Sequence, residues 1–188
     1  MEQTARFDGG NHILISNRIP YEFFITQGSG ESNIAIHAGS YHLALKDAGI
    51  EAYNIICYSS ILPGIARQID KPQGMVHGSV METIMAVGNF EQGESGAAGI
   101  IFGWLYDKQT QEKYGGLVCE TSGKTTEKKI EQELNDSLQE LYTNGFSEQY
   151  DLRDITLISR ELTVEKKHGT ALVALCFTNY YVPIIDGR

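Results

Sequence analysis

The chain has 188 residues, of which 41% are hydrophobic and 21% charged, and its formal net charge is −9 at pH 7. These values are typical of a globular protein, so we expect a single domain with one core over residues 1–188. The acidic balance argues against a nucleic-acid partner, because no basic stripe is available to neutralise phosphates. No run approaches the roughly 18 apolar residues of a membrane span, so no membrane partner is expected.

The cysteines, histidines and N-terminal residues further limit the class of protein. Cys57, Cys119 and Cys176 lie in apolar, strand-like runs, their number is odd and their spacing matches no zinc pattern, so buried reduced thiols are expected. The five histidines show no helical i, i+4 pair, and a metal site is not expected. Residues 1–10 are polar and lack the apolar core of a signal peptide, which predicts a cytoplasmic protein.

The first half of the chain alternates short apolar runs with turns that contain glycine or proline. β-branched and aromatic residues predict strands at 13–16, 21–26, 53–58 and 79–87. A turn is predicted at 28–32, whose glycines lack the pattern of a phosphate-binding loop. A helix is predicted at 38–48, because Gly49 suits the left-handed position that follows a helix.

The second half contains the clearest helix of the sequence. Apolar residues recur with a 3.6-residue period over 126–143, and Asn144-Gly145 is expected to supply the left-handed residue that ends this helix. Strands at 97–106 and 114–120 are predicted to form a hairpin, and strands at 155–164 and 170–182 a final antiparallel pair turned at 167–169. Because strands outnumber helices and short turns join them, the sequence predicts an α+β layered fold with mainly antiparallel sheets.

The segment Tyr53–Gly64 carries the most informative pattern. A strand-like run ends in Ser59-Ser60 and is followed by Pro-Gly, and most such serine pairs are only strand ends. The segment nevertheless resembles the self-cleavage site of the pyruvoyl-dependent arginine decarboxylases. The matching residues are Asn54, Ser59, Ser60, Ile61, Leu62 and Pro63.

Further matches follow in family order at 28–31, 45–50, 116–120 and 163–166. The resemblance implies a four-layer αββα sandwich of mainly antiparallel sheets. It also implies a homotrimer or a dimer of trimers, with active sites shared between subunits and a small-molecule amino acid as substrate.

The resemblance implies that the Ser60 hydroxyl attacks the carbonyl of Ser59 and that Ser60 becomes a pyruvoyl group. The chain would then consist of a β chain, 1–59, and an α chain, 60–188. Such a ketone can absorb the negative charge that decarboxylation leaves on the substrate's Cα, which no ordinary side chain can do. Asn54 matches the asparagine that supports processing, although a strand residue satisfied by the backbone is an equally good interpretation. Glu120 matches the general acid, and an apolar setting would raise its pKa for that role; the alternative is a solvent-facing glutamate.

The implied reaction is the conversion of arginine to agmatine and carbon dioxide, with His42 and Leu45 at substrate-binding positions. Tyr41-His42 stands where the family usually has an aromatic residue followed by aspartate, whose carboxylate would pair with a guanidinium. Either another acid such as Asp47 or Glu51 takes this role, or the enzyme decarboxylates another amino acid. A different class remains open: an unprocessed homologue that serves as a ligand-binding or assembly module.

Overall fold

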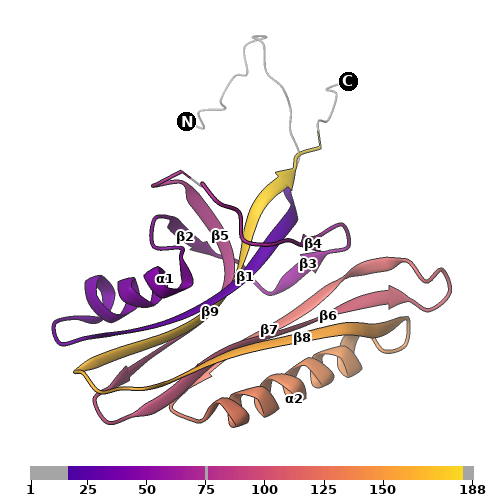
Figure 1. Ribbon diagram of the computed structural model, residues 1–188. Helices are drawn as coiled ribbons and strands as arrows, with labels where there is room; N and C mark the ends of the chain where they lie inside the picture. The colour runs from indigo at the N-terminus through magenta and orange to yellow at the C-terminus, as the bar shows by residue number, and fades with distance from the viewer. Residues whose placement is uncertain (1–16, 75, 184–188) are drawn as a thin grey trace, which may run out of the picture.

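A computed structural model describes residues 17–74 and 76–183. Two β-sheets are stacked face to face, and a helix covers the outer face of each one (Figure 1). The first sheet has the order β2-β5-β9-β1-β4 and the second the order β3-β7-β6-β8. The α+β class that the sequence predicted and the αββα layers that the resemblance implied are therefore confirmed. The predicted strand at 13–16 lies outside the described residues.

The strands of the first sheet differ widely in length. They are β1 (Ile19–Ser32), β2 (Asn54–Cys57), β4 (Arg67–Gln68), β5 (Val80–Glu91) and β9 (His168–Tyr181). The second sheet contains β3 (Ile61–Pro63), β6 (Ser95–Asp107), β7 (Lys113–Gly123) and β8 (Tyr150–Thr163). The short β2 and β3 form edges of their sheets, and they are joined directly along the chain.

Three apolar clusters follow from the alternation of side chains along these strands. The largest fills the space between the sheets and includes Phe23, Ile84, Phe102, Trp104 and Phe177. The opposite face of the first sheet packs on α1 (His42–Ala48), and that of the second sheet packs on α2 (Glu127–Gly145). The expected helical face of α2 is confirmed, because Ile130, Leu134 and Leu138 are its buried residues.

The turn predicted at 28–32 is wrong, because β1 continues as a strand through Ser32. Glycine is needed here because α1 passes close to the strand. A Cβ on Gly28 would lie 2.2 Å from the carbonyl oxygen of Ala44, and one on Gly30 would lie 2.5 Å from its nitrogen. The glycines therefore permit a close approach of helix to strand rather than a reversal of the chain.

The helix predicted at 38–48 has two parts, a π-helix over Ile36–Tyr41 and then α1. Gly49 ends α1 with φ 68°, as the sequence predicted. At the other helix the expectation for Asn144-Gly145 is wrong. Helix α2 continues through Gly145, and Phe146 is its C-cap residue with φ −134°.

The predicted pairing of the last two strands is also wrong. β8 pairs with β6 in the second sheet, whereas β9 pairs with β1 and β5 in the first. The connection at 164–167 thus crosses between sheets instead of forming a hairpin. The reason is burial: β9 is buried from Gly169 to Phe177, which requires partners on both of its edges.

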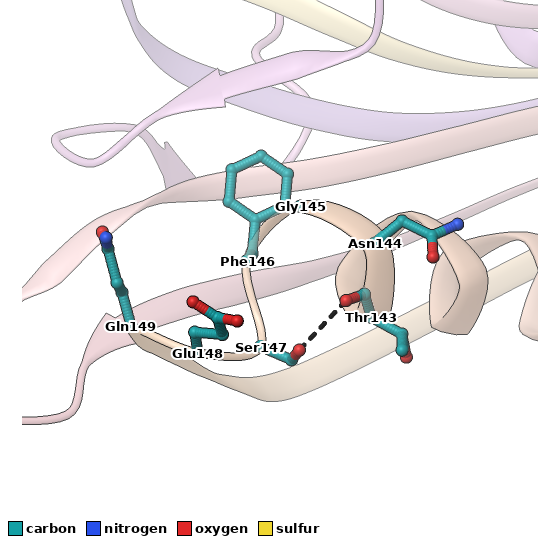
Figure 2. Close-up of a pocket in the computed structure, with 7 residues that line it drawn as sticks. All are labelled: Thr143, Asn144, Gly145, Phe146, Ser147, Glu148 and Gln149. Atoms are coloured by element: carbon teal, nitrogen blue, oxygen red, sulfur yellow. Dashed lines mark hydrogen bonds between the residues drawn. The ribbon is translucent and has the colours of Figure 1, made fainter.

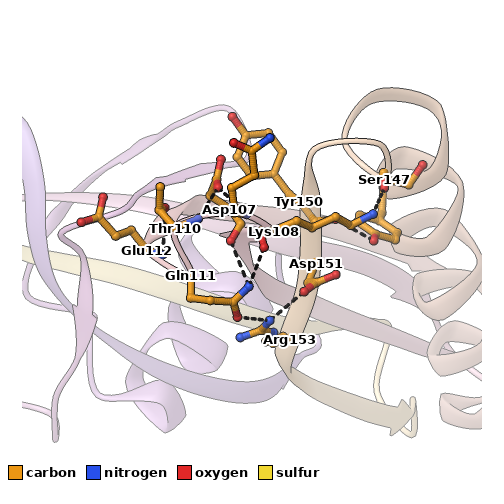
Figure 3. A network of polar contacts seen from close by, with 11 residues as sticks. Asp107, Lys108, Thr110, Gln111, Glu112, Ser147, Tyr150, Asp151 and Arg153 are labelled. Atoms are coloured by element: carbon orange, nitrogen blue, oxygen red, sulfur yellow. Dashed lines mark hydrogen bonds and ion pairs between the residues drawn. The ribbon is translucent and has the colours of Figure 1, made fainter.

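The β6–β7 hairpin is confirmed, and polar contacts fix its turn to the connection after α2 and to the start of β8 (Figure 3). Lys108 Nζ donates to the carbonyl oxygen of Ser147 over 2.5 Å, and Arg153 donates to Gln111 Oε1 over 2.6 Å. The cysteines are free, but only Cys176 is buried, whereas Cys57 is exposed on β2. The expectation of three buried thiols is therefore confirmed for Cys176, wrong for Cys57 and only partly met by Cys119, which is intermediate in exposure.

No helix of the described residues is both long and apolar enough to cross a membrane.

Candidate active site

The Ser59–Ser60 peptide bridges the two sheets. On one side the backbone N–H of Tyr58 donates to the carbonyl oxygen of Thr83 in the first sheet, over 2.7 Å. On the other side the carbonyl oxygen of Ser60 accepts from Val118 in the second sheet, over 3.2 Å. The peptide between these two anchors is therefore held at both ends without belonging to either strand ladder.

The hydroxyl of Ser60 points to a carboxylate. Ser60 Oγ lies 2.6 Å from both Oε1 and Oε2 of Glu120, on β7. A hydroxyl that donates to a carboxylate can lose its proton to that carboxylate as the oxygen attacks a carbonyl. The structure thus brings together Ser60 and Glu120, which are 60 residues apart in sequence. Glu120 is exposed in the isolated chain, not enclosed in an apolar setting.

A backbone donor is directed at the carbonyl that precedes Ser60. The N–H of Ile61 donates to the carbonyl oxygen of Ser59 over 3.0 Å. A donor in this position stabilises negative charge that develops on the oxygen when the carbonyl carbon is attacked. A hydroxyl, a carboxylate and a backbone N–H donor therefore lie around one peptide bond.

Asn54 stands at the start of β2, and its side chain is bound to the backbone. Asn54 Nδ2 donates to the carbonyl oxygen of Gly78 over 2.8 Å. This contact matches the interpretation of Asn54 as a strand residue satisfied by the backbone. The same side chain also lines a cavity at the end of β2.

That cavity of about 300 Å³ contains both predicted substrate-binding positions, His42 and Leu45. Its described lining has no carboxylate and consists of His37, Tyr41, His42, Leu45, Tyr53, Asn54 and Ile55. The rings of His37 and Tyr41 are stacked with centroids 5.8 Å apart, and burial raises the pKa of the Tyr41 hydroxyl. The cavity is therefore lined mainly by aromatic rings, two of them imidazoles, and it does not include Ser60 or Glu120.

The acids suggested as replacements for a carboxylate at position 42 are not in this lining. Asp47 Oδ2 accepts from the backbone N–H of Ser29 over 2.9 Å and pairs with Arg160 at 3.2 Å. These contacts hold Asp47 in a different cavity, beside Ser29 and Lys166. Glu51 is an exposed turn residue after α1.

One charged group in this region was missed by reasoning from the sequence. Glu82 on β5 is only 2% exposed and forms an ion pair with Arg18, which precedes β1. The available signal was a lone glutamate inside the apolar run 80–87. Its partner could not be inferred, because 64 residues separate the two.

A further hollow, lined by 143–149, lies at the end of α2 (Figure 2). The chain turns back at the end of the helix, where Ser147 Oγ donates to the carbonyl oxygen of Thr143 over 3.0 Å. None of the predicted site residues lines the hollow, and we assign it no chemistry.

Comparison with known proteins yields one family. Residues 22–182 match the family model for pyruvoyl-dependent arginine decarboxylase (PvlArgDC). The Thermoplasma volcanium pyruvoyl-dependent arginine decarboxylase is 33% identical over 75 residues, which are 38% of this chain and 40% of the relative. The Pyrococcus abyssi protein of the same name is 28% identical over 139 residues, 73% of this chain and 83% of the relative.

Other relatives, like the Thermoplasma protein, align over a much shorter part of the chain than the Pyrococcus protein does. The Methanosarcina mazei pyruvoyl-dependent arginine decarboxylase 2 is 34% identical over 71 residues, 36% of this chain and 38% of the relative. The chain thus spans about two fifths of the length of the Thermoplasma and Methanosarcina relatives.

Proposed function

The chain belongs to the family of pyruvoyl-dependent arginine decarboxylases, and on this premise we propose that it cleaves itself between Ser59 and Ser60 and then decarboxylates an amino acid. One observation carries the proposal: Ser60 Oγ lies 2.6 Å from both carboxylate oxygens of Glu120, at a peptide that bridges the sheets. The cleavage gives a β chain, 1–59, and an α chain, 60–188.

In the proposed cleavage, Ser60 Oγ attacks the carbonyl carbon of Ser59 and Glu120 accepts the hydroxyl proton. The Ile61 N–H stabilises the developing oxyanion. The bond from the Ser59 carbonyl to the Ser60 nitrogen then breaks, the nitrogen takes up a proton, and an ester replaces the peptide. Loss of the Ser60 α-proton expels the Ser59 carboxylate, and water converts the unsaturated residue to a ketone and ammonia.

The residues present fit the pyruvoyl group that the family name implies, because a serine with a directed hydroxyl follows the carbonyl to be attacked. When formed, this group supplies a ketone that accepts electrons from the substrate's α-carbon. Glu120 lies beside position 60, so it can hold a proton on its carboxyl group and deliver it to the α-carbon after carbon dioxide leaves. The Ser60–Glu120 contact also favours an active enzyme over an unprocessed module.

The first substrate to test is arginine, which the family name gives and which would yield agmatine. The cavity at His42 and Leu45 favours a second candidate, a decarboxylase for another amino acid. No carboxylate is present in the described lining to pair with a guanidinium. A panel of arginine, lysine, ornithine, histidine, aspartate and glutamate, assayed by release of carbon dioxide, decides between the two.

We infer that the chain assembles as a trimer or a dimer of trimers. The His42 cavity and the Ser60–Glu120 pair are separate within one chain, so a neighbour's cavity can complete the site. Large apolar side chains on β2, β3 and the strands paired with them are exposed, namely Ile56 (48%), Ile61 (71%), Val80 (58%) and Tyr114 (60%). Light scattering tests the inference, and a monomer at working concentration contradicts it.

The test of the function is a denaturing gel with intact-mass measurement of the purified protein. We expect two fragments that divide after Ser59, the larger with an N-terminus blocked by the ketone. Ser60→Ala should remain one chain, because it has no hydroxyl to begin the reaction, whereas the matched Ser122→Ala on β7 should cleave normally. A wild-type chain that stays whole after prolonged incubation contradicts the proposal.

A further inference from the structure

Glu82 is an unusual residue for its position. It lies on the face of β5 that looks into the space between the sheets, where its neighbours Ile84 and Ala86 are apolar core residues. Its exposure is 2%, and burial of a carboxylate is costly unless a partner compensates it. An apolar residue of similar volume would fill this place without that cost.

Among the described residues, the buried carboxylate of Glu82 has a hydrogen-bond partner on only one of its two oxygens. Oε1 accepts from the guanidinium of Arg18, but Oε2 has no hydrogen-bond partner within 17–74 and 76–183. The same guanidinium lies 5.1 Å from the centre of the Tyr180 ring and 3.4 Å from the hydroxyl of Tyr58. A carboxylate, an aromatic face and a hydroxyl thus form a binding site for a guanidinium, and Arg18 occupies it.

This cluster surrounds the last residue that is anchored before the bridging peptide. The backbone of Tyr58 is bound to Thr83, the residue after Glu82, and its ring lies 5.7 Å from that of Phe177. Phe177 is also the cross-strand partner of Glu82. Tyr58 is therefore held by its backbone, its ring and its hydroxyl, and the Ser59–Ser60 peptide begins at the next residue.

We propose that the Arg18–Glu82 pair is a positioning device for self-cleavage, which holds Tyr58 so that the carbonyl of Ser59 faces the hydroxyl of Ser60. The inference rests on the proposed function. Neither charged residue touches the reacting atoms: Arg18 acts through Tyr58, and Glu82 acts through Arg18. A pair that only stabilised the fold would need no contact with Tyr58.

The first measurement is the rate of self-cleavage of freshly purified precursors. Arg18→Ala should cleave about 10- to 100-fold more slowly, the factor expected when a hydrogen-bonded charge partner is lost. Millimolar methylguanidinium should restore much of the rate, because it can refill the site, while sodium chloride at equal ionic strength should not. Arg18→Ala/Glu82→Gln should gain nothing from methylguanidinium, since the carboxylate that binds it is gone.

The chain supplies a matched control at the β1–β4 edge of the same sheet. Arg67 pairs with Glu22 and lies 4.9 Å from the centre of the Tyr21 ring, but it has no contact with the bridging peptide among the described residues. Arg67→Ala should therefore cleave at the wild-type rate. Thermal unfolding of every variant shows whether it is folded, and Tyr58→Phe, which keeps the ring, gives a second test if Arg18→Ala does not fold.

Each outcome decides the proposal. Slow cleavage of Arg18→Ala with rescue that requires Glu82 supports it, as does slow cleavage of folded Tyr58→Phe. Wild-type rates in both variants overturn it, and so does slow cleavage of Arg18→Ala that methylguanidinium leaves unchanged, because the pair then contributes only stability. If the wild-type chain itself does not cleave, the proposed function fails and this inference fails with it, an outcome distinct from the others.

Discussion

Strand β9 and the segment Asn54–Pro63 belong to the same sandwich but differ in strand pairing and in burial. β9 pairs on both edges, with β1 and β5, and it is buried from Gly169 to Phe177. The segment contributes four residues to the edge of one sheet and three to the edge of the other. Ser59, between these two strands, is exposed.

The difference explains where backbone chemistry is possible. In β9 the N–H and C=O groups are engaged in strand ladders, and the surrounding core prevents access to the carbonyl carbons. The Ser59–Ser60 peptide lies outside both ladders, yet Tyr58 and Ser60 fix its ends to rigid sheets. A peptide bond that is held but not paired can therefore be attacked by a neighbouring hydroxyl. The predictions below test this contrast.

The largest effect is expected at the reactive segment. Glu120→Gln keeps a hydrogen-bond acceptor for the Ser60 hydroxyl but removes both the base for cleavage and the later proton donor. Cleavage should therefore slow, and turnover of the processed protein should fall by roughly 10²- to 10⁴-fold. Turnover is measured as carbon dioxide release by fully processed protein. Glu112→Gln, at the far end of the β6–β7 hairpin, is the control and should be normal. Unchanged turnover in processed Glu120→Gln would show that the acid is a different residue.

The next effect concerns the stability of β9. Leu175 is 0% exposed between the sheets, so Leu175→Ala should lower the free energy of unfolding by about 2–5 kcal/mol. Ile56→Ala on β2, where the side chain is 48% exposed, should cost about 1 kcal/mol or less. Both are measured by urea denaturation in the uncleaved Ser60→Ala background. Equal losses would refute the contrast between the two regions.

A smaller effect is expected at the cavity beside β2. His42→Asp places a carboxylate in a lining that has none, so the preference for arginine over histidine or glutamate should rise by about 10- to 100-fold. Competition assays with the processed enzyme measure this ratio. Leu43→Asp adds the same charge to α1 outside that cavity and should leave the ratio unchanged. If His42→Asp has no effect, His42 does not face the substrate.

The smallest effect requires no substitution. Burial raises the pKa of the Cys176 thiol on β9 to about 12, whereas Cys57 on β2 is exposed. A raised pKa means that Cys176 remains protonated at pH 8, so an alkylating reagent should modify Cys57 quickly and Cys176 only after unfolding. Peptide mass spectrometry gives the two rates. Comparable rates in the native protein would show that β9 opens as readily as the edge strand.

Much of the fold could be predicted from local pattern alone. The apolar runs at 79–87 and 97–106 and the helical period at 126–143 correspond to β5, β6 and α2. The two strands are buried on both faces over most of their length, whereas α2 buries one face. Gly28 and Gly30 misled the prediction, since a glycine that permits close packing has the same sequence signal as one that forms a turn. The pairing of the last two strands was also predicted wrongly, because strands that are consecutive in sequence are usually neighbours in a sheet.

The sequence by itself determined that Ser59-Ser60 follows a strand, and the order of its motifs identified the family. Only the tertiary structure decided which groups meet at that junction. Glu120 lies beside the Ser59–Ser60 peptide because β3 pairs with β7, and Arg18 reaches Glu82 because β1 and β5 both pair with β9. Such contacts join residues that are 60 or more positions apart, and strand register sets them. Local propensity carries no information about register, which depends on how whole sheets pack.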